Sequence, residues 1–322
     1  MKRISEYSSV VESAVRAMEL PGGKLEGLYG PVKYGMEAGG KRLRPVMVLM
    51  GAEAFGADPL KAVEPAVGVE LFHNFTLLHD DVMDNSALRR GRPSVHARWD
   101  ANTAILSGDT MLTLATEYVT RVDDSLLRRV IAAFDRMALD VYEGQRLDMD
   151  FEKRESVTTE EYIEMIKLKT GALLGFAVML GALIGGASDE DARKMYDFGM
   201  MLGVAFQIED DWLDTFGDPA AFGKPIGNDI RQNKQTYLLV SGLQSGSADV
   251  EALRVAMAMP ATDTKVRTVT RIYEKMGLKE SAHAAVAEYA SRAMSALRAT
   301  GLGEAQKDAF RLLVEKLAGR RK

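Results

Sequence analysis

Cysteine is missing from the 322-residue chain, which excludes disulfide bonds and thiolate metal sites. That absence fits a reducing compartment, and we expect a cytoplasmic protein. Proline is scarce, with nine residues that lie outside the strongest helical patterns. Basic residues are in deficit: the net charge is −5, whereas a nucleic-acid binder usually carries a basic patch. We therefore expect no nucleic-acid partner.

Long hydrophobic runs are also rare. The longest uncharged stretch, "TGALLGFAVMLGALIGGAS" at 170–188, is marginal for a membrane span, which needs ~20 mostly apolar residues. Its glycines thin the apolar content further. The pattern predicts a closely packed helix buried in the protein, and no membrane span. The N-terminal "MKRISEYSSVVESAVRAMEL" lacks the apolar core of a signal peptide.

Helical periodicity dominates what is present. Apolar residues recur at three- and four-residue spacing in 10–20, 44–55, 125–149 and 308–319, and beta signals are few. Proline and glycine punctuate between these segments, as at "FGDPAAFGKPIG". No low-complexity linker divides the chain. We predict an all-α, single-domain bundle over residues 1–322, with about ten or more helices at the usual globular length.

One acidic pattern occurs twice. "LLHDDVMD" and "FQIEDDWLD" both end in Asp-Asp-x-x-Asp, at Asp80, Asp81 and Asp84 and again at Asp210, Asp211 and Asp214. On a helix the first and last carboxylates of each set lie one turn apart, where like charges destabilise the helix. A single such cluster is usually a solvated surface. Two copies, each emerging from apolar helix, favour Mg²⁺ bound with a substrate phosphate.

Basic residues accompany the acidic clusters. They lie in "GGKRLRP", "LRRGRP", "LKT", "GKP" and "NKQ", as Lys41, Arg42, Arg44, Arg89, Arg90, Arg92, Lys169, Lys224 and Lys234. Arginine and lysine suit phosphate oxygens. Acidic and basic sets together suggest two diphosphates, one chelated through metals and the other gripped directly.

Together these motifs resemble the trans-type isoprenyl diphosphate synthases of the polyprenyl synthetase family. "GGKRLRP", "ELFHNFTLLHDDVMDNSALRRGRPSVH", "GQRLD", "LKT", "FQIEDDWLD" and "GKPIGNDIRQNK" follow in the family's order and spacing, between about residues 35 and 240. The resemblance implies a helical bundle around a central cavity. It also implies Mg²⁺-dependent, head-to-tail joining of isopentenyl diphosphate to an allylic diphosphate, with three Mg²⁺ per active site.

The resemblance also implies roles for individual residues. Direct Mg²⁺ binding falls to Asp80, Asp84 and Asp214, with support from Asp81, Asp210 and Asp211. The allylic diphosphate would be held by Arg89, Lys169 and Lys224, and isopentenyl diphosphate by Lys41, Arg44, His73 and Arg90. Thr170 and Gln207 would lie along the reacting carbons, with Asp148 near the metals. Asn233 stands where the family usually has glycine, so Lys234 is given only a secondary role.

A helical wheel bears on His73. A lone histidine near apolar residues is more often a structural hydrogen-bonder, but His73 lies about 20° from the azimuth of Asp80, two turns away. We therefore expect His73 to contact substrate, since imidazole can donate to phosphate.

Product length depends on what blocks the growing chain. In this family the residues four and five places before the first aspartate often form the floor, and here they are Thr76 and Phe75. This pair resembles geranylgeranyl diphosphate synthases, and Phe72 is a further candidate wall. We expect a C20 product, with C15 as the alternative. The family is usually dimeric, and we expect a homodimer formed through 69–78 and 107–118.

Three rival interpretations remain. A terpene cyclase shares the first acidic motif but has a different second motif and would not need "GGKRLRP". A non-catalytic subunit of a heteromeric synthase tends to lose an acidic triad, and both triads are intact. A di-iron bundle would require Glu-x-x-His pairs, and none accompanies these motifs.

Overall fold

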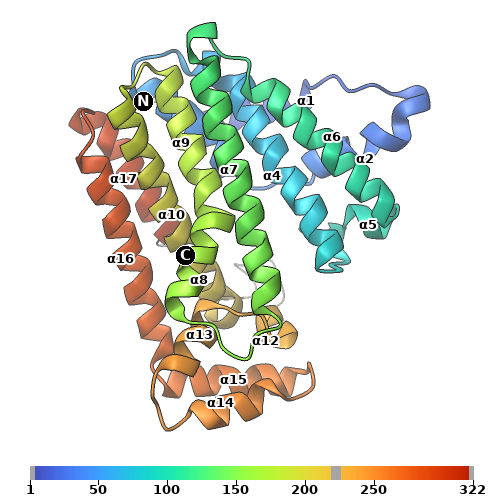
Figure 1. Ribbon diagram of the computed structural model, residues 1–322, viewed down its shortest axis with the longest axis vertical. Coiled ribbons are helices and arrows are strands. Elements are labelled where there is room, and N and C mark those ends of the chain that lie inside the picture. The colour runs from blue at the N-terminus through green and yellow to red at the C-terminus, as the bar shows by residue number, and fades with distance from the viewer. Residues whose placement is uncertain (1–3, 219–225, 319–322) are drawn as a thin grey trace. The chain divides into compact units, whose positions relative to one another are not determined.

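The computed structural model describes residues 4–218 and 226–318, and it is built almost entirely of helices (Figure 1). Among these residues the strands are β1 (Leu88–Arg89) and β2 (Arg92–Pro93), which form one antiparallel hairpin. The all-α class expected from the sequence is confirmed. The helices are α1 (Ile4–Arg16), α2 (Glu26–Met36), α3 (Leu43–Ala54), α4 (Val63–Met83), α5 (Val95–Arg98), α6 (Ala101–Val119), α7 (Asp124–Phe151), α8 (Thr159–Ile166), α9 (Ala172–Ile184), α10 (Asp189–Phe216), α12 (Asn228–Gln232), α13 (Tyr237–Gln244), α14 (Val250–Met257), α15 (Asp263–Lys275), α16 (Leu278–Arg298) and α17 (Glu304–Ala318), with short 3₁₀ turns η1 (Gly23–Leu25) and η2 (Pro59–Ala62) and a π-helical turn η3 (Lys167–Gly171).

The chain forms two compact units. Unit 1 comprises residues 1–135 and 176–196, and unit 2 comprises residues 136–175 and 197–322. Helices α7, α9 and α10 contribute residues to both units. A single catalytic domain over the whole chain stays a prediction.

Unit 1 is organised around α4, which lies along α6 (Figure 1). One face of α4 is apolar and almost fully buried, with Leu71 and Phe72 at 0 % exposure. Gly68 permits the close approach of α6, because a Cβ there would come 2.6 Å from the backbone nitrogen of Val119. Burying each large apolar side chain contributes about 1.5–3 kcal/mol. This packing holds the C-terminal end of α4, which carries the first acidic cluster.

Glycines in the apolar run 170–188 serve helix packing. In unit 2 a Cβ on Gly203 of α10 would lie 2.6 Å from the Cα of Gly171, and in unit 1 a Cβ on Gly181 would lie 2.1 Å from the carbonyl oxygen of Val48. Residues 159–184, η3 included, form one helix long and apolar enough to cross a membrane, but 78% of its most apolar window is buried within the protein. The expectation of a buried, closely packed helix is confirmed for this segment.

Unit 2 has its own core, in which α8, α10, α13, α15 and α16 bury apolar side chains together. Ile208 and Trp212 of α10 lie in this core, on either side of Asp210 and Asp211 in sequence. The capping box of α8, in which Thr158 and Glu161 satisfy each other's backbone N–H groups, fixes where that helix begins. The second acidic cluster therefore emerges from buried helix, as its apolar neighbours predicted.

Candidate active site

The first acidic cluster lies at the C-terminal end of α4. Asp80 and Asp81 occupy its last turn, and Asp84 caps it by donating its backbone N–H to the carbonyl oxygen of Asp80 at 2.8 Å. Asp80 and Asp84 are half-buried, whereas Asp81 is 3 % exposed. The C-terminal end of a helix carries partial negative charge, so carboxylates are unfavourable there and cations are favoured.

Asp81 is held by an arginine of the β1–β2 hairpin. Arg89 donates to Asp81 Oδ1 from Nη2 at 2.5 Å and from Nε at 3.0 Å. Burial raises the pKa of Asp81, and the Arg89 guanidinium opposes that effect. Asp81 is thus held within the protein by Arg89, which lies beside the cluster.

The hairpin was not predicted from the sequence. Its two-residue loop is Arg90-Gly91, with φ of 53° and 76°, the left-handed conformation that two-residue hairpin turns require. Arginine is an unusual residue at that position, and two-residue strands are too short to show periodicity. The turn brings the Arg90 guanidinium against Gly40 of "GGKRLRP", where a Cβ would lie 2.8 Å from its Cζ.

A cluster of arginines surrounds His73. Arg44 Nη1 lies 3.2 Å from His73 Nε2, which accepts the hydrogen bond because arginine can only donate. Burial, and then the charges of Arg44, Arg90, Arg89 and Arg42, lower the pKa of His73 well below its usual value. His73 is therefore neutral at physiological pH. The structure brings together Arg44, His73 and Arg90, three of the four side chains expected to hold isopentenyl diphosphate. The fourth, Lys41, is exposed in the segment between α2 and α3.

A small pocket in unit 1 opens between the acidic Asp81 and the arginines of the hairpin. It is lined by Asn74, Asp81 and the three hairpin arginines, together with Tyr34 and apolar groups, and its volume is about 20 Å³, room for about one water. Arg92 lies over the Tyr34 ring at 4.0 Å and so fixes the hairpin against α2.

Four phenylalanines form an aromatic cluster in unit 1. Phe72 meets Phe75 and Phe134 edge-on at 5.4 Å each, and Phe134 meets Phe176 at 5.7 Å. Phe72 is 0 % and Phe75 6 % exposed, while Thr76 is half-buried and donates to the carbonyl oxygen of His73 at 2.8 Å. Such edge-to-face pairs are worth about 0.5–1.5 kcal/mol beyond their burial, so this part of α4 is stiffly packed.

The second acidic cluster also lies at a helix C-terminal end, that of α10. Asp211 accepts hydrogen bonds from the Tyr162 hydroxyl at 2.5 Å, the Tyr237 backbone N–H at 2.8 Å and Gln207 Nε2 at 3.1 Å. Burial raises the pKa of Asp211 to about 7, against the effect of these donors. Burial and the neighbouring Asp211 keep Tyr162 protonated by raising its pKa well above the usual value.

Asp214 is tied to the segment that follows α10. Its Oδ2 accepts the Asp229 backbone N–H at 3.1 Å, and its carbonyl oxygen accepts that of Gly227 at 2.6 Å. Asp210 is half-buried. Sequence reasoning missed Tyr162 and the backbone donors, because neither belongs to an acidic or basic pattern.

The π-helical turn η3 presents Lys169 and Thr170. Lys169 Nζ donates to Asp148 Oδ2 at 2.5 Å, and Thr170 Oγ1 donates to Gln207 Oε1 at 3.2 Å. Gly144 of "GQRLD" lets α7 approach, since a Cβ there would come 2.3 Å from the Lys169 nitrogen. Four residues singled out from the sequence thus form two contacting pairs in unit 2. π-turns are frequent at functional sites.

The departure from the family pattern at Asn233 has a structural explanation. Asn233 has φ 57°, a left-handed conformation that asparagine tolerates better than most residues, and its Oδ1 accepts Lys265 Nζ at 2.5 Å. Lys265 is 1 % exposed, so this bond gives a buried ammonium an acceptor. Lys224 lies outside the described residues.

The donor set fits Mg²⁺. Within residues 4–218 and 226–318 no three carboxylate or imidazole groups stand together as a ready-made cage. Mg²⁺ does not need one, because it commonly binds one or two carboxylates, several waters and substrate phosphate oxygens. Each unit by itself offers carboxylates at the negative end of a helix, α4 in unit 1 and α10 in unit 2, and each set can supply ligands to a cation.

Two Asp-Asp-x-x-Asp clusters and a cluster of basic side chains suited to diphosphate, carried on an all-helical fold, are typical of prenyl-transferring proteins. A sequence model of the polyprenyl synthetase family matches residues 26–276. The chain belongs to this family and is a prenyltransferase of isoprenoid biosynthesis.

Individual relatives agree with this assignment. Geranylgeranyl diphosphate synthase from Methanosarcina mazei is 40% identical over 270 residues, 83% of each chain. The structure of geranylgeranyl pyrophosphate synthetase from Pyrococcus horikoshii Ot3 matches with a TM-score of 0.90 and 34% identity, covering 98% of this chain and 96% of that one. A geranylgeranyl pyrophosphate synthase from Corynebacterium glutamicum, solved with isoprenyl diphosphate and magnesium, matches with a TM-score of 0.87 and 25% identity, over 99% and 98%.

Proposed function

We propose that this prenyltransferase condenses isopentenyl diphosphate with dimethylallyl, geranyl or farnesyl diphosphate and releases geranylgeranyl diphosphate, a C20 product. The observation that carries this is the arrangement in unit 1. An acidic patch suited to metal-bound diphosphate adjoins an arginine cluster suited to direct diphosphate binding, and Arg89 bonded to Asp81 links them. Two diphosphate-binding sites of different kinds suit an enzyme that joins two diphosphate substrates.

The arginine cluster, as a second diphosphate-binding site, distinguishes this function from terpene cyclisation. A cyclase acts on one diphosphate and has no use for Arg44, Arg90 and the neutral His73 in their observed arrangement. The three hydrogen bonds that hold Asp211 in place favour a catalytic protein over a non-catalytic subunit, in which the second cluster would not need to be held.

Different side chains bind the two substrates. Lys41, Arg44, Arg90 and His73 hold isopentenyl diphosphate, with neutral His73 accepting from Arg44 and keeping one N–H to donate. Arg89, Lys169 and Lys224 hold the allylic diphosphate. Thr170 and Gln207 direct their oxygens toward the allylic carbons, and buried apolar surface keeps out water that would quench a cation.

Chemistry follows from this placement. The allylic C–O bond breaks, the isopentenyl double bond forms the new C–C bond, and a proton leaves the resulting cation. The chain offers no obvious base, so the released diphosphate accepts that proton. Mg²⁺, three ions per site, would supply Lewis-acid stabilisation of the leaving diphosphate, held by Asp80, Asp84 and Asp214.

Product length is set by the aromatic cluster. A chain growing toward Phe75 and Phe72 meets edge-packed rings that cannot move aside without disturbing Phe134 and Phe176. Small Thr76 leaves room before that floor, which favours C20 over C15.

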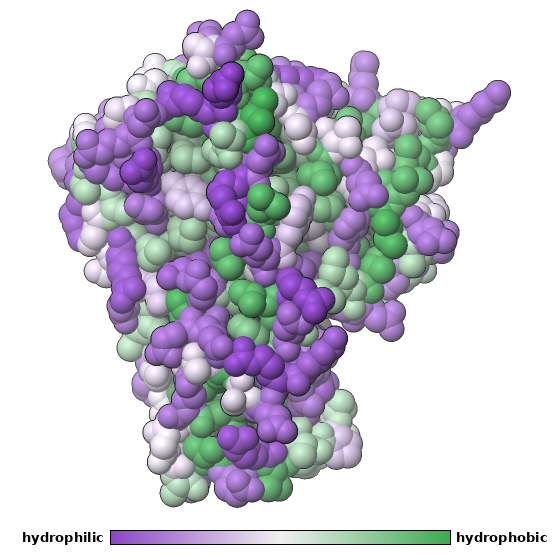
Figure 2. Space-filling view, viewed as in Figure 1, coloured by the Kyte–Doolittle hydropathy of each residue, from purple (hydrophilic) through white to green (hydrophobic). Residues whose placement is uncertain are grey.

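We also propose a cytoplasmic homodimer. Residues 69–78 were expected to form part of the dimer interface, but most of them are buried inside unit 1 and are not available to a second copy. On α6 the exposed face is better suited, with Ile105 43 % and Leu106 58 % exposed. Figure 2 shows hydrophobic residues among hydrophilic ones on the right of the view, where Figure 1 labels α6 and α5. Symmetric dimers are the commonest oligomers. Sedimentation showing only a 35.3 kDa species at micromolar concentration would refute the dimer.

One assay tests the proposed reaction. Purified protein is incubated with Mg²⁺, labelled isopentenyl diphosphate and each allylic diphosphate, and the dephosphorylated products are separated by chromatography. We expect elongation to C20 without a partner protein. A cyclic hydrocarbon from one substrate would favour a cyclase, and no elongation without a second protein would favour a non-catalytic subunit.

Variants of the floor test the chain length in the same assay. Phe75→Ala should lengthen the product by one or more five-carbon units. Phe72→Ala should do so too, at a stability cost of about 3–5 kcal/mol because Phe72 is fully buried. Leu25→Ala, at a 51 % exposed site on η1, is the matched control and should leave the distribution unchanged. A wild-type product of C30 or longer, or no shift in either variant, would remove the proposed floor.

A further inference from the structure

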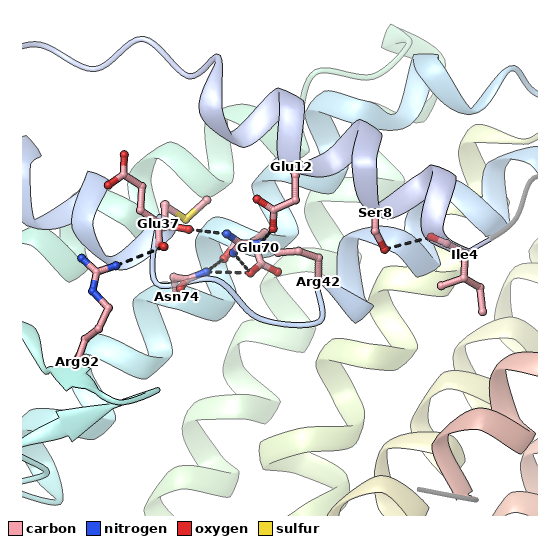
Figure 3. Close-up of polar contacts among 9 residues, drawn as sticks. Ile4, Ser8, Glu12, Glu37, Arg42, Glu70, Asn74 and Arg92 are labelled. Carbon is pink, nitrogen blue, oxygen red and sulfur yellow. Dashed lines mark hydrogen bonds and ion pairs between the residues drawn. The ribbon is translucent and has the colours of Figure 1, made fainter. Parts of the chain in front are cut away.

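Arg42 lies at the centre of the basic motif "GGKRLRP", yet it is 4 % exposed whereas Lys41 beside it is exposed. Its guanidinium donates from Nε to Glu12 Oε1 at 2.7 Å, from Nη1 to Glu70 Oε1 at 2.6 Å and from Nη2 to the Met36 carbonyl oxygen at 2.5 Å. Figure 3 shows these bonds converging on one side chain. All three guanidinium nitrogens are bonded within the protein, so Arg42 is not placed to bind a phosphate.

These partners come from three different helices. Glu12 belongs to α1 and Glu70 to α4, while Met36 ends α2, where a carbonyl lacks an intrahelical partner. Arg42 itself is the N-cap of α3. One buried side chain therefore fixes the start of α3 against α1, α2 and α4.

The backbone of Arg42 depends on the same bonds. Its φ of 46° and ψ of 36° are left-handed, a conformation unfavourable for a residue with a side chain. Such a conformation persists only where surrounding contacts determine it. Glu70 is itself held by Asn74, whose Nδ2 donates to Glu70 Oε1 at 3.1 Å and to the Glu70 carbonyl oxygen at 2.8 Å (Figure 3).

The residues on either side of Arg42 are those proposed to grip isopentenyl diphosphate. Arg44, two residues later, bonds to His73, and Gly40, two residues earlier, receives the Arg90 guanidinium. Arg92 Nη1 also reaches the Glu37 carbonyl oxygen at 3.4 Å, so the hairpin rests on the same loop. A change in the turn at Arg42 would move Lys41, Arg44 and the seat of Arg90 together.

We propose that Arg42 and Glu70 are positioning residues for isopentenyl diphosphate. Their buried ion pair holds the left-handed turn that aims Lys41 and Arg44, and neither residue touches the substrate. This inference rests on the proposed function. The competing interpretation is that Arg42 leaves Glu70 and binds the diphosphate itself.

The conservative variants Arg42→Lys and Glu70→Gln separate these interpretations. Lysine keeps the charge but cannot replace the three-nitrogen fork, and glutamine keeps the volume but removes the charge. Positioning predicts weaker isopentenyl diphosphate binding in both variants. A ligand role predicts that Glu70→Gln, by releasing Arg42, leaves binding unchanged or tightens it.

Binding is measured calorimetrically with isopentenyl diphosphate alone in EDTA, and steady-state kinetics give KM for each substrate. We expect each variant to raise the Kd and KM for isopentenyl diphosphate about tenfold, a range that small misplacements of binding groups can reach. KM for the allylic substrate should stay within about twofold. In the double variant the two effects should be less than additive, because both break one ion pair.

Arg121→Lys is the matched control. Arg121 also bonds two glutamates, Glu64 of α4 and Glu117 of α6, but lies away from the basic motif. Its replacement should leave both KM values unchanged. Unaltered isopentenyl diphosphate binding in either variant, tighter binding in Glu70→Gln, or equal rises in both KM values would each overturn the inference. Wild-type protein that neither binds isopentenyl diphosphate nor elongates a primer would instead refute the proposed function.

Discussion

The two acidic clusters have the same pattern and the same place at a helix end, but their middle aspartates are satisfied in opposite ways. Asp81 bonds to the charged guanidinium of Arg89, whereas Asp211 bonds to a phenol, an amide and a backbone N–H. Arg89 is partly exposed, while Tyr162 and Asp211 are fully buried. The first cluster is thus balanced by a formal charge that a substrate anion can also use, and the second by dipoles that do not change. Identical motifs therefore do not imply identical electrostatics.

The largest expected effect concerns what the clusters share. Asp80→Ala and Asp214→Ala should each reduce the rate on the order of a thousandfold or more, about 4 kcal/mol of transition-state stabilisation. EDTA should abolish activity in the wild type. Steady-state kinetics will check this, with Asp135→Asn at an exposed position of α7 as the control. Loss of activity in only one of the two variants would show that the two clusters do not share a metal-binding role.

A smaller effect is expected where the second cluster is supported by residues 228–237. Asn233→Ala removes the partner of buried Lys265 and leaves a left-handed backbone without asparagine's tolerance, so unfolding should become easier by about 2–3 kcal/mol. Asn233→Gly should cost about 1 kcal/mol less, because glycine accepts that conformation. Chemical denaturation measures both. Equal losses would show that the backbone conformation is not strained.

The middle aspartates themselves can be compared in metal-free protein. Asp81→Asn should lower stability by about 1 kcal/mol, because the charge-assisted bond to Arg89 becomes neutral while the burial that disfavours the ionised Asp81 is also relieved. Asp211→Asn at pH 8 should change it by less than about 1 kcal/mol or raise it, because burial disfavours the ionised carboxylate that it replaces. Thermal unfolding in EDTA distinguishes the two. A larger loss in Asp211→Asn than in Asp81→Asn would reverse the ranking.

The effect expected of His73 is confined to acidic pH. Its folded-state pKa is lowered by burial and nearby arginines, so below about pH 6.5 the unfolded chain binds the extra proton more readily than the folded one. Stability should therefore fall as pH decreases from about 6.5, by at most about 1.4 kcal/mol per pH unit, and His73→Asn should remove that part of the slope. Parallel slopes in the two proteins would show that His73 does not contribute.

Local patterns in the sequence were sufficient for much of this molecule. Periodicity located α3, α7 and α17 to within a few residues at most ends, and the acidic motifs were correctly placed on helices. The expected helix at 10–20 lies instead at Ile4–Arg16, so only residues 10–16 of the expected range are helical. Glycine spacing in 170–188 correctly indicated close helix packing.

What remained hidden depends on pairs distant in sequence. Arg42 was grouped with phosphate-binding residues because its neighbours are basic, and only the fold brings Glu12 and Glu70 to it. The Arg90-Gly91 turn and the donors to Asp211 were missed for the same reason. Roles that depend on substrate, such as those of Lys169 and Thr170, stay predictions.

The π-helical turn η3 bears on how this gene can change. A π-turn holds one residue more than an α-helical turn, because its hydrogen bonds join residues five apart and not four. The turn absorbs that extra residue, so deleting one residue from Lys167–Gly171 would restore a regular α-helix and leave the rotation of the helix beyond it nearly unchanged. A single deletion in the regular helix that follows the turn would instead rotate what lies beyond it by about 100° and remove Gly181 from its contact with Val48. Single-residue deletions should therefore disturb the helix packing less within this turn than beside it, and their cost within the turn should be the loss of the contacts of Lys169 with Asp148 and of Thr170 with Gln207.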